Sequence, residues 1–196
     1  MSFDALPAPV RRFIESRRVF HAMRGLMCWG TLPRVEAALA LQPGERLLDI
    51  GCGTGLFAPR ADGFYLGVDP ALDALRFARA RFPGGQRHFA AMRPGSFDKG
   101  LIANVAHHLS EAELDQLLCA VREVVRGPLV VLDAALDIAN PVERALLRYD
   151  RGAYVRTTAA LRPLLARRYA IEREERFHNT LHVVPQVLFR LVGGRA

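Results

Sequence analysis

Short apolar runs alternate along the chain with segments in which apolar residues recur at helical spacing. A continuous apolar run is typical of a strand that is buried on both faces of a parallel sheet. Helical spacing is clearest in residues 71–82 and 111–125, where one side of each predicted helix is apolar. The predicted strands comprise residues 47–50, 65–69, 88–92, 100–105, 129–133, 169–177 and 183–192. This order predicts an α/β fold with a doubly wound, mostly parallel sheet of about seven strands.

The last two predicted strands follow one another without a helix between them. This arrangement predicts an antiparallel hairpin at the end of the sheet. Pro185 lies near the beginning of the second strand. Because proline has no main-chain N–H to donate, we expect Pro185 at the start of an edge strand.

Length and composition suit a single domain over residues 1–196. Of the 196 residues, 51% are hydrophobic, which is enough for a full-sized core. The pattern divides the chain into a helical leader, a sheet core, an insertion, and a last helix with the hairpin. These parts comprise residues 1–42, 43–136, 137–156 and 157–196.

The first predicted strand runs directly into three glycines at alternate positions, in the order Leu47-Leu48-Asp49-Ile50-Gly51-Cys52-Gly53-Thr54-Gly55. Glycine lets the main chain turn sharply and approach a ligand closely. The spacing G-x-G-x-G differs from the G-x-G-x-x-G of nicotinamide dinucleotide-binding folds. Asp49 stands immediately before the loop, where it would repel a phosphate and favour a cationic ammonium group.

These nine residues resemble the first motif of the class I S-adenosylmethionine-dependent methyltransferases. A second acid, Asp69, ends the strand 65–69, where a carboxylate can accept both ribose hydroxyls of a nucleoside. The resemblance implies a Rossmann-like fold, with S-adenosyl-L-methionine as cofactor and S-adenosyl-L-homocysteine as product. It assigns cofactor binding to Asp49, Gly51, Cys52, Gly53, Gly55, Asp69, Pro70, Ala91, Met92 and Asn104. In that family, leaders such as residues 1–42 cover the cofactor or shape the substrate pocket; packing against the sheet edge is the alternative here.

One position departs from the family pattern. An acid commonly follows the third strand and accepts a hydrogen bond from the adenine amino group, but this chain has Ala90-Ala91-Met92 there. We therefore expect main-chain groups and packing on Met92 to hold adenine. The missing acid also motivates an alternative function, an inactive subunit that binds the cofactor.

Two histidines, His107 and His108, follow the fourth predicted strand. The ligand crevice of an open parallel sheet lies at the carboxyl ends of its strands, and histidine is the most frequent general base. Either residue is therefore a candidate catalytic group that removes a proton from a hydroxyl. In the alternative, one histidine begins a helix and the other packs beneath the insertion.

Four residues around the end of the insertion are candidates for substrate binding. They would lie above the same end of the sheet, and an arginine there could bind a carboxylate or phosphate with two parallel hydrogen bonds. The alternative is a solvated face held by ion pairs. These residues are Tyr149, Arg151, Tyr154 and Arg156.

Charge and cysteine usage limit the remaining classes of function. The net charge is +7, but the 27 basic residues are scattered and include one lysine, so no specific nucleic-acid surface is expected. Cys28, Cys52 and Cys119 are odd in number and far apart, which argues against a disulfide framework and a zinc site. No apolar run reaches the roughly 18 residues of a membrane span. We expect a cytoplasmic protein that requires no metal.

The resemblance therefore implies a methyltransferase that acts on a small metabolite or a glycan or natural-product precursor, at oxygen. Its expected partner is a small-molecule acceptor, and the oligomeric state stays open. A methyltransferase of RNA or protein that uses the basic surface is the alternative from another class.

Overall fold

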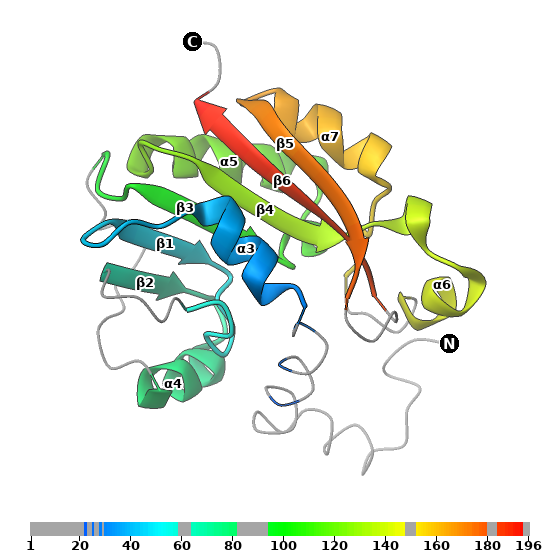
Figure 1. Ribbon diagram of the computed structural model, residues 1–196, viewed down its shortest axis with the longest axis horizontal. Helices are drawn as coiled ribbons and strands as arrows, with labels where there is room; N and C mark the ends of the chain where they lie inside the picture. The colour runs from blue at the N-terminus through cyan, green and yellow to red at the C-terminus, as the bar shows by residue number, and fades with distance from the viewer. Residues whose placement is uncertain are drawn as a thin grey trace.

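The computed structural model describes residues 22, 25, 28, 30–58, 64–81, 94–147, 152–179 and 184–193. The strands of this part are β1 (Arg46–Ile50), β2 (Phe64–Val68), β3 (Lys99–Ala103), β4 (Leu129–Ala134), β5 (Tyr169–His178) and β6 (Pro185–Gly193). They form one sheet in the order β2-β1-β3-β4-β6-β5 (Figure 1). The Rossmann-like α/β fold expected from the sequence is confirmed. The predicted strand 88–92 lies outside the described residues.

The sheet is parallel from β2 to β4 and antiparallel beyond. β1 pairs with β2 on one side and β3 on the other, and β3 pairs with β4. β6 then lies antiparallel between β4 and β5. Pro185 begins β6, as predicted, but the expectation of an edge strand is wrong, because the outer strand is β5. As the first residue of its strand, proline is tolerated there.

Helices cover both faces of the sheet. They are α3 (Leu32–Leu39), α4 (Leu72–Arg81), α5 (Glu111–Val124), α6 (Pro141–Leu147) and α7 (Thr158–Ala166), with short 3₁₀ turns η3 (Ala106–His108) and η4 (Leu136–Ile138). Figure 1 shows α3 in front of the sheet, with α5 and α7 behind it. Along β1, Leu48 packs in the cluster with α5 and α7, whereas Leu47 packs in the cluster with α3. Side chains of one strand alternate between the faces, which gives each face its own core.

The helix ends follow the local sequence. Ser110 and Glu113 form a reciprocal capping box at the start of α5, and Thr157 accepts a hydrogen bond from the N–H of Ala160 at the start of α7. Such caps satisfy main-chain donors that have no partner within the helix. They hold the helices that follow η3 and the insertion in place.

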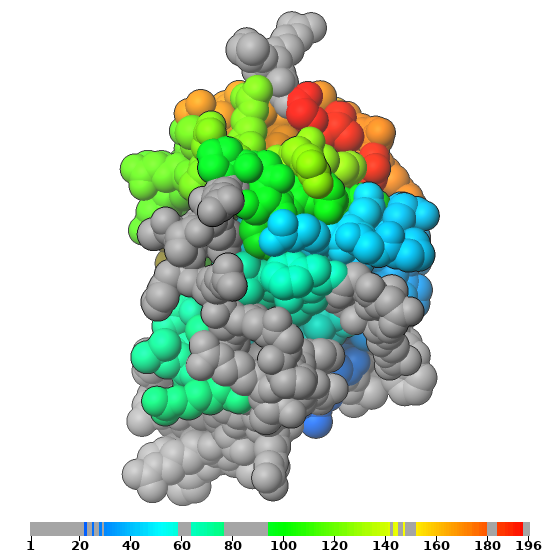
Figure 2. Space-filling view, turned by 90° about the vertical axis from the view of Figure 1, so that its left-hand side faces the viewer, coloured from blue at the N-terminus to red at the C-terminus, as the bar shows by residue number. Residues whose placement is uncertain are grey.

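The end of the sheet where the parallel strands begin is closed by structural contacts. Asp98 accepts a hydrogen bond of 2.8 Å from the N–H of Arg46 and pairs with Arg126 at 2.6 Å. The pKa of Asp98 is lowered first by this main-chain bond, and Arg126 adds to the effect. Figure 2 looks onto this end, with the hairpin in orange and red at the top. The candidate site therefore lies at the other end, where β1, β3 and β4 terminate.

Candidate active site

The loop after β1 has the main-chain geometry that its glycines allow. Gly51 has a φ of +71°, in the left-handed region that favours glycine. The N–H groups of Gly51 and Cys52 both donate to the carbonyl of Val68 at the end of β2, at 2.8 and 3.1 Å. A Cβ on Gly51 would lie 2.2 Å from Cγ2 of Val105. The loop is thus pressed between β2 and the segment that leaves β3.

Asp69 ties this loop to β2 and keeps capacity for a ligand. Its Oδ2 accepts from the N–H of Gly53 and its Oδ1 from the N–H of Ala71, each at 2.8 Å. An ionised carboxylate offers about four acceptor positions, so about two remain after these bonds. The residue is half-buried rather than enclosed. Two free acceptor positions fit the two hydroxyls of a ribose, as the predicted role of Asp69 requires.

Asp49 lies at the end of β1 and is 1% exposed. Its Oδ2 accepts a hydrogen bond of 2.6 Å from the hydroxyl of Tyr65 on β2. Cys52, the neighbour of Gly51, is also buried. Burial, followed by the negative charges of Asp49 and Asp69, raises the pKa of the Cys52 thiol to about 12. Cys52 is therefore a neutral thiol at physiological pH and not a nucleophile.

The other predicted cofactor residues lie after two different strands or outside the described residues. Pro70 is exposed directly after β2. Asn104, directly after β3, has a φ of +57°, and its N–H donates to the carbonyl of Leu132 at 2.8 Å. A left-handed non-glycine residue at a strand end is typical of functional sites. Ala91 and Met92, which were expected to contact adenine, lie outside the described residues.

His107 forms a buried pair with Asp133, the acid that ends the apolar run of β4. Its Nδ1 contacts Oδ1 of Asp133, and its main-chain N–H donates to Oδ2 at 3.0 Å. Asp133 also accepts from the N–H of Ala134 at 2.7 Å. The sequence showed Asp133 only as a strand-end acid. Its pairing with His107 was missed, although both residues follow parallel strands and so share one sheet edge.

The two histidines differ in exposure. His107 is 5% exposed, whereas His108 is exposed, and their ring centroids lie 4.2 Å apart. A Cβ on Gly152 would lie 2.2 Å from Cδ2 of His107. His107 thus packs beneath the insertion, as the alternative interpretation expected for one of the pair. His108 is the histidine that a ligand can reach.

The end of the insertion is fastened to η3. Nη1 of Arg156 donates to the carbonyl of Ala106 at 2.8 Å, and Nη2 donates to that of Leu109 at 2.7 Å. The N–H of Tyr154 donates to the carbonyl of His107 at 2.9 Å. Arg156 therefore uses both terminal nitrogens on main-chain acceptors, while the Tyr154 side chain is 44% exposed. Tyr149 and Arg151 lie outside the described residues.

A shallow hollow with no enclosed space for a water molecule lies where these elements meet. It is lined by Ala106, His107, Asp133, Ala134, Tyr154, Arg156 and Leu161. Typical ligand pockets enclose about 300–1,000 Å³. This hollow is therefore too small for a drug-sized acceptor.

The described part of the chain contains neither a metal-binding cluster nor a membrane-spanning helix. Within it, no group of three or more His, Cys, Asp or Glu side chains is arranged to hold a metal ion. None of the described helices is long and apolar enough to cross a membrane.

Comparison with known proteins agrees with this geometry. Residues 48–127 match the family described as a methyltransferase domain, a range that includes the glycine loop, Asp69 and both histidines. The match covers 80 of the 196 residues and supports the resemblance to S-adenosylmethionine-dependent methyltransferases. No curated protein sequence matches the chain significantly.

Solved structures share the fold of this chain at low sequence identity. The PH0226 protein of Pyrococcus horikoshii OT3 has a TM-score of 0.67 and 18% identity, covering 92% of this chain and 93% of its own. Magnesium protoporphyrin IX methyltransferase from Synechocystis PCC 6803 with bound SAH has a TM-score of 0.64 and 16% identity, and the match covers 95% of this chain and 99% of that protein. Geranyl diphosphate C-methyltransferase from Streptomyces coelicolor A3(2) has a TM-score of 0.67 and 13% identity, and the match covers 84% of this chain and 80% of that protein.

The candidate site thus contains two groups of predicted residues. The glycine loop, Asp49 and Asp69 form one group at the ends of β1 and β2. His107, His108, Tyr154 and Arg156 form the other, around η3. Val105 joins them, because it contacts Gly51 and stands two residues before His107. The sequence predicted the members of each group, but not the link between them.

Proposed function

We propose that this methyltransferase transfers the methyl group of S-adenosylmethionine to a hydroxyl oxygen of a small metabolite. The contact of Val105 with Gly51 carries the proposal, because it brings the segment that leads to the two histidines next to the glycine loop. Alignment of two reactants in this way can contribute about 7–11 kcal/mol to catalysis. A site with a cofactor loop on one side and an exposed imidazole on the other suits transfer to an acceptor that must lose a proton.

On the donor side, residues of this chain bind and orient the cofactor. Asp69 accepts the ribose hydroxyls, and Gly51, Gly53 and Gly55 let the main chain approach the ligand. Asp49 faces the ammonium group of the cofactor. Cys52, Pro70 and Asn104 line the rest of the cofactor site. Ala91 and Met92 pack against adenine. The bound cofactor supplies an electrophilic methyl group on a sulfonium, and every other task falls to the chain.

On the acceptor side, His108 takes the proton of the hydroxyl. His107, which Asp133 and Gly152 hold in place, packs against His108 with its ring tilted by 46° and sets its position. A general base contributes about 10²–10⁴-fold when it lies within hydrogen-bond reach of its proton. Tyr149, Arg151 and Tyr154 contact the acceptor, whereas Arg156 secures the segment that carries them.

A small acceptor is favoured over a macromolecule for two reasons. The basic residues are scattered along the chain, and many arginines of the described part form ion pairs, including Arg126, Arg162 and Arg168. In addition, two of the structural neighbours are named for small substrates, protoporphyrin IX and geranyl diphosphate. An RNA acceptor would instead give binding that weakens steeply as salt increases.

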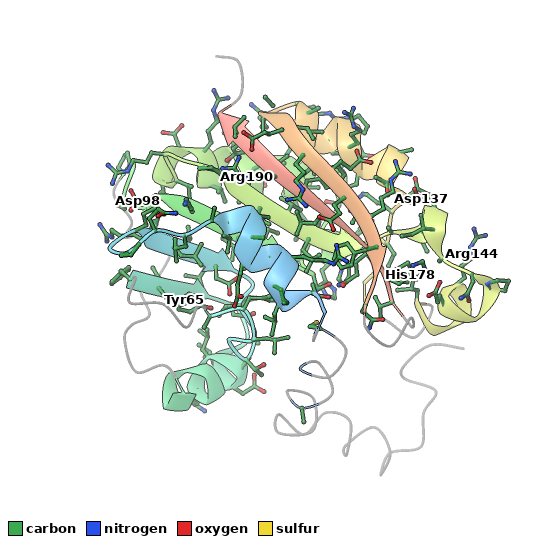
Figure 3. The ribbon with its side chains drawn as sticks, in the orientation of Figure 1. Tyr65, Asp98, Asp137, Arg144, His178 and Arg190 are labelled. Carbon is green, nitrogen blue, oxygen red and sulfur yellow. The ribbon has the colours of Figure 1, made fainter. Side chains whose placement is uncertain are left out.

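The proposal is tested with methyl-labelled S-adenosylmethionine and a metabolite pool as acceptor. Once a product is found, His108→Ala should lower kcat about 10²–10⁴-fold while the Kd of S-adenosylhomocysteine stays near wild type. His178→Ala is the matched control, because His178, labelled in Figure 3, belongs to β5 and pairs with Glu143 of α6 at 3.3 Å. An unchanged kcat in His108→Ala would contradict the role of the base. Cofactor binding without any turnover would favour the inactive subunit.

A further inference from the structure

Tyr154 is an exposed aromatic residue whose main chain is fixed beside the two histidines. Its N–H donates to the carbonyl of His107 at 2.9 Å, and this carbonyl belongs to the peptide bond that joins His107 to His108. Tyr154 is 44% exposed, and His108 is exposed as well. The main chain of an exposed aromatic residue thus lies against the peptide bond that carries the imidazole proposed as the base.

Arg156 supports the ring of Tyr154. Its Cζ lies 5.6 Å from the centroid of the ring, within the range of a cation–π contact. The guanidinium is itself fixed, because Nη1 donates to the carbonyls of Ala106 and Tyr154 and Nη2 donates to that of Leu109. An aromatic side chain that is already held in place binds a ligand at a small cost in conformational entropy. Tyr154 is therefore suited to stack against a flat ligand.

The hollow next to Tyr154 offers a face to a ligand. Tyr154, Arg156 and His107 are among its lining residues, and the described part of the chain leaves no enclosed space for a water molecule there. Affinity at this place therefore depends on contact between open surfaces. Offset stacking of aromatic rings adds to affinity beyond the area that the rings bury. A planar aromatic ligand thus fits this face better than a puckered saturated one.

The acidity of the acceptor hydroxyl favours the same class of ligand. An ordinary imidazole has a pKa of about 6.5, and a phenol such as the tyrosine side chain has a pKa of about 10. A hydroxyl on saturated carbon is about as weak an acid as water, whose pKa is about 16. Proton transfer becomes harder as the pKa of the acid rises above that of the base. An imidazole therefore removes the proton of a phenol far more readily than that of a saturated alcohol.

We propose that the methyl acceptor is a planar phenol that stacks on Tyr154 and presents its hydroxyl to His108. This assignment rests on the proposed function, because it assumes that His108 is the base and that the methyl group goes to oxygen. His108 takes the proton as the phenol O–H bond breaks, and a lone pair of the oxygen forms the new O–CH₃ bond. The S–CH₃ bond of the donor breaks, and its electron pair stays on sulfur. The products are an aryl methyl ether, S-adenosylhomocysteine and an imidazolium that returns its proton to solvent.

Matched pairs of aromatic and saturated alcohols test the class of acceptor. The pairs are phenol with cyclohexanol, 4-hydroxybenzoate with 4-hydroxycyclohexanecarboxylate, and 2-naphthol with decahydro-2-naphthol, each supplied with methyl-labelled S-adenosylmethionine. The aromatic member of at least one pair should give a labelled ether with a kcat/KM about tenfold or more above that of its saturated partner. Saturated members that react as well as the aromatic ones would overturn the inference.

Variants of Tyr154 test the stacking itself. Tyr154→Leu should raise the KM of the phenolic acceptor about three- to tenfold, as expected for a lost aromatic contact, whereas Tyr154→Phe should keep it within about twofold. Both variants should bind S-adenosylhomocysteine like wild type, which shows that they fold. Phe64→Leu is the matched control: Phe64 is 43% exposed and lies 4.9 Å from Cζ of Arg46, but it begins β2, at the opposite end of the sheet (Figure 1). An unchanged KM in Tyr154→Leu would overturn the stacking role.

4-Nitrophenol separates proton removal from stacking. This phenol is largely ionised in mildly alkaline solution and needs no base. The loss of kcat/KM in His108→Ala should therefore be about tenfold smaller, or less still, with 4-nitrophenol than with phenol. Equal losses with the two acceptors would show that His108 does not take the proton of the phenol.

The labelled products distinguish failure of the phenolic class from failure of the proposed function. An aryl methyl ether formed from the metabolite pool would support the inference even if none of the three test phenols reacts. Methyl ethers of saturated alcohols from the pool, with none from any phenol, would overturn the phenolic class and leave transfer to oxygen intact. A product methylated at nitrogen or carbon, or no labelled product from the phenols or the pool, would overturn the proposed function as well.

Discussion

The donor side and the acceptor side of the site are built differently. On the donor side, Gly53 and Asp69 are 16 residues apart, as are Asp49 and Tyr65, and all four stand on or beside two adjacent strands. On the acceptor side, His107 and Asp133 are 26 residues apart, and Arg156 reaches Ala106 and Leu109 over 50 and 47 residues. The donor side is thus nearly a local structure, whereas the acceptor side depends on the assembly of β3, β4 and the insertion.

This difference predicts that damage to one side leaves the other intact. Donor-side variants should change cofactor affinity, and acceptor-side variants should change turnover and stability. Val105 is the exception, because it touches both.

The largest loss of stability is expected at the contact between Gly51 and Val105, which connects the two sides. Gly51→Ala places a side chain on a residue in the left-handed region, which should lower the free energy of unfolding by about 1–2 kcal/mol. Its Cβ would also lie 2.2 Å from Cγ2 of Val105, and this overlap should lower the free energy of unfolding by a further amount of about 1–3 kcal/mol. Thermal unfolding should show the loss of stability, and calorimetry should show weakened binding of S-adenosylhomocysteine. In Gly51→Ala combined with Val105→Ala, the part caused by overlap should be relieved. Wild-type stability in the single variant would show that Val105 moves aside freely.

The acceptor side should be loosened by Arg156→Ala. The carbonyls of Ala106 and Leu109 lose charged donors, so the free energy of unfolding should fall by about 1.5–3 kcal/mol and kcat should fall with it. Arg156→Lys should restore only part of the lost stability, because a single ammonium nitrogen cannot occupy the positions of both terminal guanidinium nitrogens. As control, Arg162→Ala removes a side chain that is 56% exposed and pairs with Glu174, for less than about 1 kcal/mol. A large loss of cofactor affinity in Arg156→Ala would break the separation of the two sides.

The donor side is tested alone by Asp69→Ala. Loss of the ribose acceptor should weaken binding of S-adenosylhomocysteine by about 1–3 kcal/mol. Asp69→Asn keeps one oxygen acceptor and should be affected less. Calorimetry measures both variants, and an unchanged affinity would place the ribose elsewhere.

At neutral pH the smallest effect is expected at the buried Cys52, whose contribution changes only in alkaline solution. Its folded pKa of about 12 lies above the ordinary value of 9.0, so its contribution to stability is fully present below pH 9 and is lost as the pH rises toward 12. The free energy of unfolding should fall by at most about 1.4 kcal/mol per pH unit on this account. Denaturant titrations across this range should show a shallower decline in Cys52→Ala. Cys119→Ala, which removes an exposed cysteine, is the control and should keep the wild-type decline.

Several parts of the fold could be read from local patterns. The described apolar strands were predicted within a few positions, because their patterns depend on neighbouring residues. The capping box of Ser110 and Glu113 and the Thr157 cap depend on neighbouring residues in the same way. Pro185 was placed correctly at a strand start, yet its strand was assigned to the edge. Strand order decides which strand is outermost, and the residues around Pro185 do not contain that information.

The sequence by itself determined the donor loop. Three alternate glycines after an apolar run constrain the main chain directly, and an acid at the end of the next strand must lie close to them, since adjacent parallel strands share an edge. Tertiary structure alone decided what His107 and Arg156 do. Both were predicted as site residues, but their partners, Asp133, Gly152 and the carbonyls of η3, come from segments brought together by the sheet order and the return of the insertion. A side chain's chemistry is set by its residue type, whereas its partner across a long stretch of chain is set by packing.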